Sequence, residues 1–410
     1  YATLKLSTWS SAQQSDAYAI RESGAVLAYS SIVTDKTTYT AGGAIKVTVT
    51  LKDSYENLVG GQRDAVNQAI QLPNTKAESI AWNEDQKGIY TATYTALLPG
   101  TGLKAQLQMS GWANALTSND YSISGDAASA QIVAMQVTTG NPDVLANGSD
   151  RHTVNVRVED QFGNVLPEQT VTFTVTKGAA VFANAGQSAD IRTDAHGMAE
   201  VDLSSTVADA STVEAKINQS SDSKTVNFVA DVSTAQVAEL VVTQDGSVAD
   251  GSTANMLRVR VTDVFGNVLA GQTVSVTADN GATVAPVVIT GPDGTVEISV
   301  TSQTAGTSAV TASINNSSLS RNVTFVADVR TAKIADLVVI KDGSVADGAT
   351  ANTLQVKVTD ANGNTLAGQT VSVTADNSAM VALTVITEPD GTVEISVTSQ
   401  TAGTSTVTAS

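Results

Sequence analysis

The chain repeats itself at a period of 97 residues, and this feature constrains its fold more than any other. Three short motifs each return 97 residues later: a D-x-x-G-N motif, an FVADV segment and a PDGTVEISV segment. Their first and second positions are 263–267 and 360–364, 228–232 and 325–329, and 292–300 and 389–397. An earlier copy, DQFGN at 160–164, precedes the first D-x-x-G-N motif by 103 residues, and the extra six fall in the loop region 177–190. A fixed period indicates one folding unit copied along the chain.

Within each copy, apolar residues alternate with polar ones. Val154, Val156 and Val158 are separated by Asn155 and Arg157. A period of two residues is typical of a half-buried strand, and Gly, Asn and Asp cluster between such runs as turn residues do. Short strands at intervals of about 8 to 12 residues predict an all-β fold of tandem immunoglobulin-like β-sandwiches. Because a repeat contacts only its neighbours, we expect an elongated rod.

The composition limits what can hold such a sandwich together. The chain has no cysteine, so disulfides and metal–thiolate sites are excluded, and only 4% of its residues are aromatic. Each sandwich must therefore be held by aliphatic packing, with Phe173, Phe228 and Phe325 as the expected large core residues. Each tryptophan (Trp9, Trp82 and Trp112) lies before the three clear copies.

The net charge of −18 argues against a nucleic-acid partner, because an acidic surface repels phosphate. No apolar run is long enough for a transmembrane helix, and the N-terminus lacks the pattern of a signal peptide. Since the chain opens with Tyr1 and not Met, we expect it to be an internal piece of a longer protein.

The repeat boundaries predict five segments. The first repeat is a divergent copy in which DSYEN replaces DQFGN, and the fourth ends at Ser410, which aligns with Ser313, so we expect it to lack its last strand. The leading segment is either an N-terminal extension or the last hairpin of a preceding unit. The segments are 1–28, the first repeat 29–129, the second repeat 130–232, the third repeat 233–329 and the fourth repeat 330–410.

The combination of TDxxGN, AGQTV, PDGTVEISV and TAGTxxVTAS resembles the bacterial Ig-like repeats of the intimin and invasin family of outer-membrane adhesins, most closely its FdeC-type members. The resemblance implies the extracellular arm of a Gram-negative surface adhesin, anchored through an upstream β-barrel that is not in this chain. It also implies a host-cell surface or extracellular-matrix protein as partner. We expect a monomer without cofactor and without enzymatic activity.

The motif residues have a structural role that needs no ligand. Gly266 and Asn267 can adopt a positive φ, and Asp263 can cap the turn by accepting backbone N–H groups. His152 aligns with Asn255 of the next copy and His196 with an aspartate, so we expect both histidines in exposed turns.

Acidic residues near the joints raise the question of calcium. They could supply the oxygen ligands that calcium prefers, but their spacing matches no calcium-loop motif, and a solvated acidic surface explains them better. We therefore predict no metal site and no catalytic site. The residues are Asp231, Glu239, Asp245 and Asp250 with their counterparts Asp328, Asp336, Asp342 and Asp347.

A receptor site inside this chain is best placed in residues 1–129, because that part departs from the repeats and holds the tryptophans. Trp82 and Trp112 are the candidate partner-binding residues, since aromatic side chains are enriched where interfaces concentrate their energy. The alternative is that both are core residues of a larger sandwich.

Two other classes of protein remain open. Such repeats also act as spacers in secreted glycan-degrading enzymes and in phage or surface-layer structural proteins. An enzyme would show paired carboxylates or aromatic stripes in a non-repeating domain, which this sequence does not contain.

Overall fold

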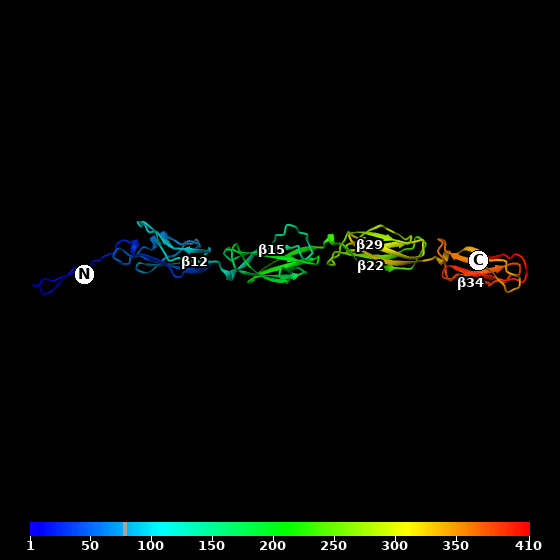
Figure 1. Cartoon of the computed structure of the whole chain (residues 1–410). Helices are drawn as coiled ribbons and strands as arrows, with labels where there is room; N and C mark the ends of the chain where they lie inside the picture. The colour runs from blue at the N-terminus through cyan, green and yellow to red at the C-terminus, as the bar shows by residue number, and fades with distance from the viewer. Residues whose placement is uncertain (77–79) are drawn as a thin grey trace. The chain divides into compact units, whose positions relative to one another are not determined.

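The computed structural model describes residues 1–76 and 80–410, and β-strands dominate it (Figure 1). Within those ranges the other regular elements are one seven-residue α-helix and four short 3₁₀ turns. No described helix has the length and apolarity to cross a membrane. The predicted all-β fold of tandem sandwiches is confirmed.

The third repeat shows the complete sandwich. One sheet has the order β22-β24-β28-β26 and the other the order β23-β30-β29-β25-β27. The 3₁₀ turn η3 (Val232–Thr234) leads into it. Its strands are β22 (Gln236–Gln244), β23 (Ser247–Val248), β24 (Asn255–Thr262), β25 (Thr273–Ala278), β26 (Thr283–Val284), β27 (Val287–Ile289), β28 (Thr295–Thr301), β29 (Gly306–Ile314) and β30 (Ser317–Val326).

The second repeat has the same two sheets, in the orders β13-β15-β19-β17 and β14-β21-β20-β16-β18. Its longer loop between β17 and β18 lies in the region where the sequence has six extra residues. Its elements are η2 (Ala127–Ser129), β13 (Gln131–Val137), β14 (Val144–Leu145), β15 (His152–Glu159), β16 (Thr170–Lys177), β17 (Val181–Phe182), β18 (Ser188–Arg192), β19 (Met198–Ser204), β20 (Ala210–Ile217) and β21 (Ser220–Val229).

The first repeat is a variation on this plan. Its two main sheets have the orders β3-β5-β8-β7 and β4-β12-β9. A small third sheet has the order β11-β10-β6, and its strand β6 comes directly after the helix α1 in the chain. A two-residue ladder joins β1 (Thr3–Leu4) to β2 (Gln13–Gln14) ahead of it. Its elements are η1 (Leu27–Tyr29), β3 (Ser31–Thr34), β4 (Thr38–Thr40), β5 (Ala44–Thr50), α1 (Arg63–Ala69), β6 (Ile70–Gln71), β7 (Asn83–Gln86), β8 (Ile89–Thr95), β9 (Gly100–Leu103), β10 (Gln106–Leu107), β11 (Leu116–Thr117) and β12 (Tyr121–Ser124).

The fourth repeat has two smaller sheets, β31-β32-β35 and β34-β33-β36. Its last strand, β36, has three residues, whereas the corresponding β29 has nine. Its elements are η4 (Val329–Thr331), β31 (Lys333–Lys341), β32 (Asn352–Thr359), β33 (Thr370–Ala375), β34 (Thr384–Ile386), β35 (Thr392–Val397) and β36 (Val407–Ala409).

The cores are built from the alternating residues that the sequence predicts. Leu257, Val259 and Val261 of β24 are fully buried against residues of the facing sheet. The three phenylalanines expected in the cores, Phe173, Phe228 and Phe325, are each at most 3% exposed, so that prediction is confirmed.

The described residues form two compact units, and each is treated by itself. The second unit includes two loops of the second repeat together with the third and fourth repeats. The first unit comprises residues 1–144, 151–204 and 209–227, and the second comprises 145–150, 205–208 and 228–410.

The burial of Phe325 gives a direct test of this core. We expect Phe325→Ala to lower the free energy of unfolding of the third repeat by about 3–5 kcal/mol, because it removes a buried ring and leaves a cavity. Phe265→Ala is the control, since that ring is 48% exposed, and its effect should stay within about 0.5 kcal/mol. Hydrogen exchange of residues 295–326 measures both. Equal effects of the two changes would contradict the assigned core.

Candidate functional site

The D-x-x-G-N turn is built around a buried carboxylate. Asp263 is fully buried, and its Oδ1 accepts hydrogen bonds from the backbone N–H groups of Phe265 and Asn267, both at 2.9 Å. Gly266 has a φ of +88°, which is strained for any residue with a Cβ. The predicted capping role of Asp263 is confirmed. Asn267 does not adopt a positive φ, so that part of the prediction is wrong. It contributes through its side chain, which donates a hydrogen bond to Asp263.

The second oxygen of the same carboxylate ties the turn to the connector that leads into its repeat. Asp263 Oδ2 accepts a bond from the backbone N–H of Asp231 at 3.2 Å and one from Asn267 Nδ2 at 2.8 Å. This connector bond recurs in every repeat. Its counterparts are Asp126 N–H to Asp160 at 3.0 Å, Asp328 N–H to Asp360 at 3.2 Å and Ser23 N–H to Asp53 at 3.1 Å.

The Asn side chain of the motif also reaches a loop of the preceding repeat. Asn364 Nδ2 donates to the carbonyl oxygen of Gln303 at 3.0 Å, and its Oδ1 accepts from the N–H of Ala305 at 2.8 Å. These two bonds hold the amide on both sides, and both lie within one compact unit. The same pattern appears between Asn267 and residues 206 and 208, and Asn164 donates to the carbonyl oxygen of Leu97 at 2.8 Å.

Hydrogen bonds lower the pKa of the motif carboxylate in three of the four repeats. Burial alone raises the pKa of Asp53, but bonds from the Asn57 side chain and from the N–H groups of Tyr55, Asn57 and Ser23 outweigh it, and the pKa falls to about 2. The same balance of burial against hydrogen bonds lowers the pKa of Asp160 and Asp360. In these three repeats the ionised carboxylate is therefore stabilised by donors of its own chain.

Several of the acidic residues considered for calcium cap loops individually. Asp231 accepts from the N–H and hydroxyl of Ser233, at 3.0 and 2.6 Å, at the start of η3. Asp250 accepts from the N–H groups of Ser252 and Thr253, both at 2.7 Å. Across residues 1–76 and 80–410, no three His, Asp or Glu side chains come together as metal ligands.

The two histidines differ in environment. His196 lies in a turn with its side chain 85% exposed, as expected. His152 is only 2% exposed, so the expectation of an exposed turn residue is wrong. It begins β15, and its Nε2 lies 2.8 Å from the carbonyl oxygen of Asn227 on the closing strand β21. Asn255 makes the same link to Thr324 in the third repeat, at 3.0 Å, which explains why a histidine aligns with an asparagine.

The structure separates the two candidate partner-binding tryptophans. Trp82 is 4% exposed and stacks edge-on against Tyr94 in the core, so its side chain has no surface for a partner. Trp112 is half-buried, and its Nε1 donates to the carbonyl oxygen of Ala25 at 3.0 Å. The sequence reasoning missed a related signal, which is that all eight tyrosines also lie in residues 1–121.

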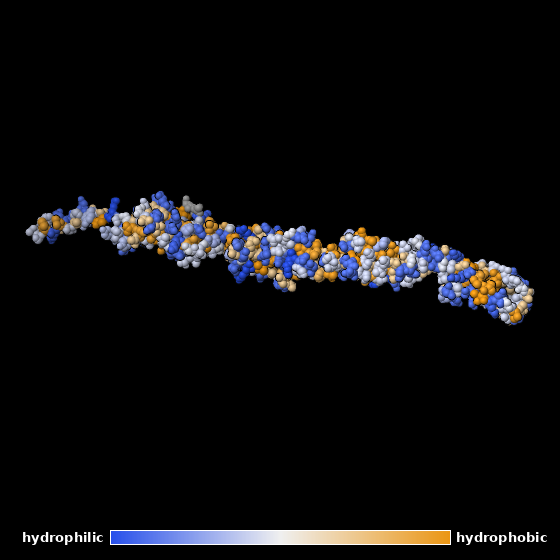
Figure 2. Space-filling view, turned by 45° about the horizontal axis from the view of Figure 1, so that its top comes forward, coloured by the Kyte–Doolittle hydropathy of each residue, from blue (hydrophilic) through white to orange (hydrophobic). Residues whose placement is uncertain are grey.

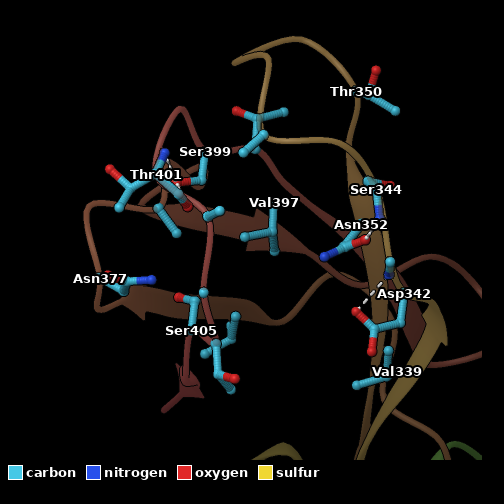
Figure 3. A pocket seen from close by; sticks show the side chains of 18 of the residues that line it. Val339, Asp342, Ser344, Thr350, Asn352, Asn377, Val397, Ser399, Thr401 and Ser405 are labelled. Carbon is cyan, nitrogen blue, oxygen red and sulfur yellow. Dashed lines mark hydrogen bonds between the residues drawn. The ribbon is translucent and has the colours of Figure 1, made fainter.

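A groove of about 740 Å³ opens in the fourth repeat (Figure 3). Leu337 and Val339 line it from β31, Asn352 from β32, Val397 from β35 and Val407 from β36. Val397 lies among polar side chains on two walls, Asn352 and Asp342 on one and Asn377 and Ser405 on the other, which suits an extended peptide (Figure 3).

The repeated sandwich and its shared turn define a class of tandem Ig-like modules, and comparison with known proteins identifies which one. The profile of the bacterial Ig-like domain (group 1) family matches residues 134–229, 237–326 and 334–410. The chain belongs to this family of bacterial Ig-like domains.

The relatives include surface adhesins. The chain is 32% identical over 384 residues to the inverse autotransporter adhesin YeeJ of Escherichia coli K12, an alignment that covers 91% of this chain and 16% of that protein. The resemblance to adhesins that the motifs indicate is confirmed. This chain thus spans only about a sixth of its relative's length.

Solved structures of adhesins are also similar. The crystal structure of invasin, a bacterial integrin-binding protein, has 25% identity and a TM-score of 0.38, over 68% of this chain and 57% of that one. The Escherichia coli adhesin FdeC has 17% identity and a TM-score of 0.42, over 75% and 100%. At these TM-scores neither likeness adds to the assignment.

The donors around Asp53 give a pH prediction. The stabilisation from ionised Asp53 is fully present above pH 3.8 and is lost as the pH falls toward 2, because the folded state lowers the pKa. We expect Asn57→Ala to raise the pKa of Asp53 toward 3.8, measured by NMR titration of its side-chain carboxyl carbon. Asn164→Ala, the same change in the second repeat, should leave it unaltered. An unchanged titration in Asn57→Ala would contradict the assigned hydrogen bonds.

Proposed function

We propose that this chain is part of the extracellular arm of a Gram-negative surface adhesin, which projects a host-cell or matrix binding surface from the outer membrane. The observation that carries the proposal is that the same hydrogen bonds, from the connector to the motif Asp and from the motif Asn to the preceding loop, recur from one repeat to the next. The 32% identity with an inverse autotransporter adhesin supports the same function. Anchoring falls to an upstream β-barrel outside this chain, and the arm is a monomer on the bacterial surface.

An arm of this kind has to resist bending, and the motif provides a way to do so. The connector is short, and its N–H is fixed to the buried Asp of the next repeat. The Asn amide holds a loop of the preceding repeat with bonds in both directions. Two anchors, one on the connector and one on a loop of the preceding repeat, leave the joint little rotational freedom.

The arm works by adhesion and reach, without catalysis. Among the described residues, His152 is held by backbone and threonine oxygens, and His196 is exposed next to Asp194. General acid–base catalysis requires such a group beside a nucleophile or a bound substrate, in defined geometry. The repeats instead use their polar residues for turns and caps.

The receptor surface of this chain belongs in residues 1–129. This part holds every tryptophan and tyrosine of the chain, whereas the three matched repeats have none. Trp112 is half-buried, not enclosed like Trp82, and is the residue that we assign to partner contact.

Scattering and spin-label distances test the arm. We expect a radius of gyration well above the roughly 22 Å of a compact 410-residue globule. Glu297→Cys and Glu394→Cys introduce two exposed cysteines at matching positions of neighbouring repeats. Because the chain has no cysteine of its own, spin labels attach only to these two. Asn364→Ala should broaden the label-to-label distance distribution, and Asn322→Ala, an exposed residue of β30, should not. A compact particle would refute the proposed arm.

Cell adhesion tests the receptor surface. We expect the immobilised full chain to bind host cells or matrix proteins, and Trp112→Leu to weaken binding by about tenfold, the loss typical of an interface aromatic. Trp82→Phe is the control, since that side chain is buried. Binding carried wholly by residues 130–410 would overturn the placement. Binding by no part of the chain would move the receptor site to another domain of the longer protein.

A further inference from the structure

The third repeat shows what completes an Ig-like sandwich of this family. Its closing strand β30 lies between β29, with which it pairs antiparallel along nine residues, and β23, with which it pairs in parallel. Val323 and Phe325 of β30 point into the core and are 0% and 1% exposed. β30 therefore closes the sheet and supplies the largest side chain of that core.

In the fourth repeat the same place is open. The counterpart of β29 is shortened to Val407–Ala409, and residues 344 and 345, the counterparts of β23, form no strand. The groove of about 740 Å³ lies between these segments. The two repeats are nearly identical in sequence, so the groove marks the volume that β30 fills in the third repeat.

Burial of matched residues supports this assignment. Leu240 is 1% exposed, whereas its counterpart Leu337 is half-buried. Val310 is fully buried and Val407 is half-buried. Val339 is 56% exposed at the edge of the groove, and Figure 2 shows apolar residues gathered on the surface of this repeat. Side chains that face a closing strand in one copy thus face solvent in the other.

The groove also has polar anchors for a strand backbone. In the third repeat, Asn255 Nδ2 donates to the carbonyl oxygen of Thr324 at 3.0 Å, and Asp245 Oδ1 accepts from the N–H of Thr324 at 2.6 Å. In the second repeat, His152 takes the place of Asn255 and faces the carbonyl oxygen of Asn227. The first residue of β15 and of β24 therefore contacts a carbonyl oxygen of the closing strand in both complete repeats.

The fourth repeat keeps these anchors in position. Asn352 Oδ1 accepts from the N–H of Ser344 at 2.9 Å, as Asn255 does from Ser247 at 3.0 Å. Its amide nitrogen points into the groove, and Asp342 lies on the same wall (Figure 3). The side chain is thus oriented to donate to a strand carbonyl before any strand is present.

We propose that this groove is the seat of an extended strand with the residue pattern of β30, supplied by the residues that follow Ser410 in the longer protein. Apolar residues at the positions of Val323 and Phe325 would fill the groove. The residue between them would accept a hydrogen bond from Asn352 at its backbone C=O and donate one to Asp342 from its backbone N–H, as Thr324 does with Asn255 and Asp245. The inference does not depend on the adhesin proposal.

The source of the strand follows from the order of strands in the other repeats. β21 comes directly after β20, and β30 directly after β29, with only two residues between. The fourth repeat ends in β36, the counterpart of β29, and its adhesin relative is about six times longer than this chain. A second copy is a poorer source, because its β30 is already paired on both sides.

A peptide of residues 314–328 with blocked ends, added to the full chain, is the direct test. We expect one peptide per chain by calorimetry, with slower hydrogen exchange at residues 343–346 and 407–409. A peptide carrying Val323→Asp and Phe325→Asp should bind more than about a hundredfold more weakly, since two buried side chains are lost. No binding, or equal binding of both peptides, would overturn the proposal.

Variants of the chain locate the peptide. Asn352→Ala should weaken binding by about tenfold, as expected for a lost buried hydrogen bond. Asn362→Ala, in the same repeat but bonded to Ala249, should not. In a chain with the sequence of residues 314–328 added after Ser410, the groove should be filled and the peptide excluded. Peptide binding to that extended chain would overturn the site, and concentration-dependent dimers of the original chain would overturn the source.

Discussion

Every repeat depends on a continuous layer of small aliphatic side chains between two sheets. The chain has no cysteine and therefore no disulfide to stabilise the fold, so the apolar area that the two sheets bury must supply the stability. Val259, Val274 and Val310, from three different strands of the third repeat, are fully buried in one cluster. Such a layer is only as complete as its last strand. In the fourth repeat Leu337 and Val407 are half-buried where their counterparts are buried, whereas Val356 and Val373 stay buried, so the last strand controls burial along the open edge of the layer.

The buried aspartate of each turn solves a different problem. A carboxylate away from water is costly unless donors surround it. Asp263 has four: three backbone N–H groups and the amide of Asn267. Because these donors come from the turn and from the connector, satisfying the charge also fixes where one repeat begins. The motif recurs for this reason, and its recurrence requires no ligand.

The chain divides its tasks between uniform and divergent parts. The matched repeats use Val, Thr, Ser and Gly to build sandwiches with the same joints, which suits an arm. Residues 1–129 add a helix, a third small sheet and every tryptophan and tyrosine of the chain, which suits the recognition role that we propose for them. This division fits the adhesin arm that we propose, since it assigns reach and binding to different parts of one polypeptide.

Sequence alone determined the repeat length, the all-β fold, the inward residues of each strand and the capping role of Asp263, because these follow from local periodicity and turn chemistry. It did not determine which polar side chains reach across space. The partners of Asn267 lie about 60 residues away and that of His152 lies 75 away, so no local pattern reveals them. The burial of Trp82, too, was decided by the tertiary fold. Long-range contacts depend on how complete sheets face each other. The sequence predicts that the fourth repeat lacks its last strand, but only the folded structure shows the groove at that place and the side chains that line it.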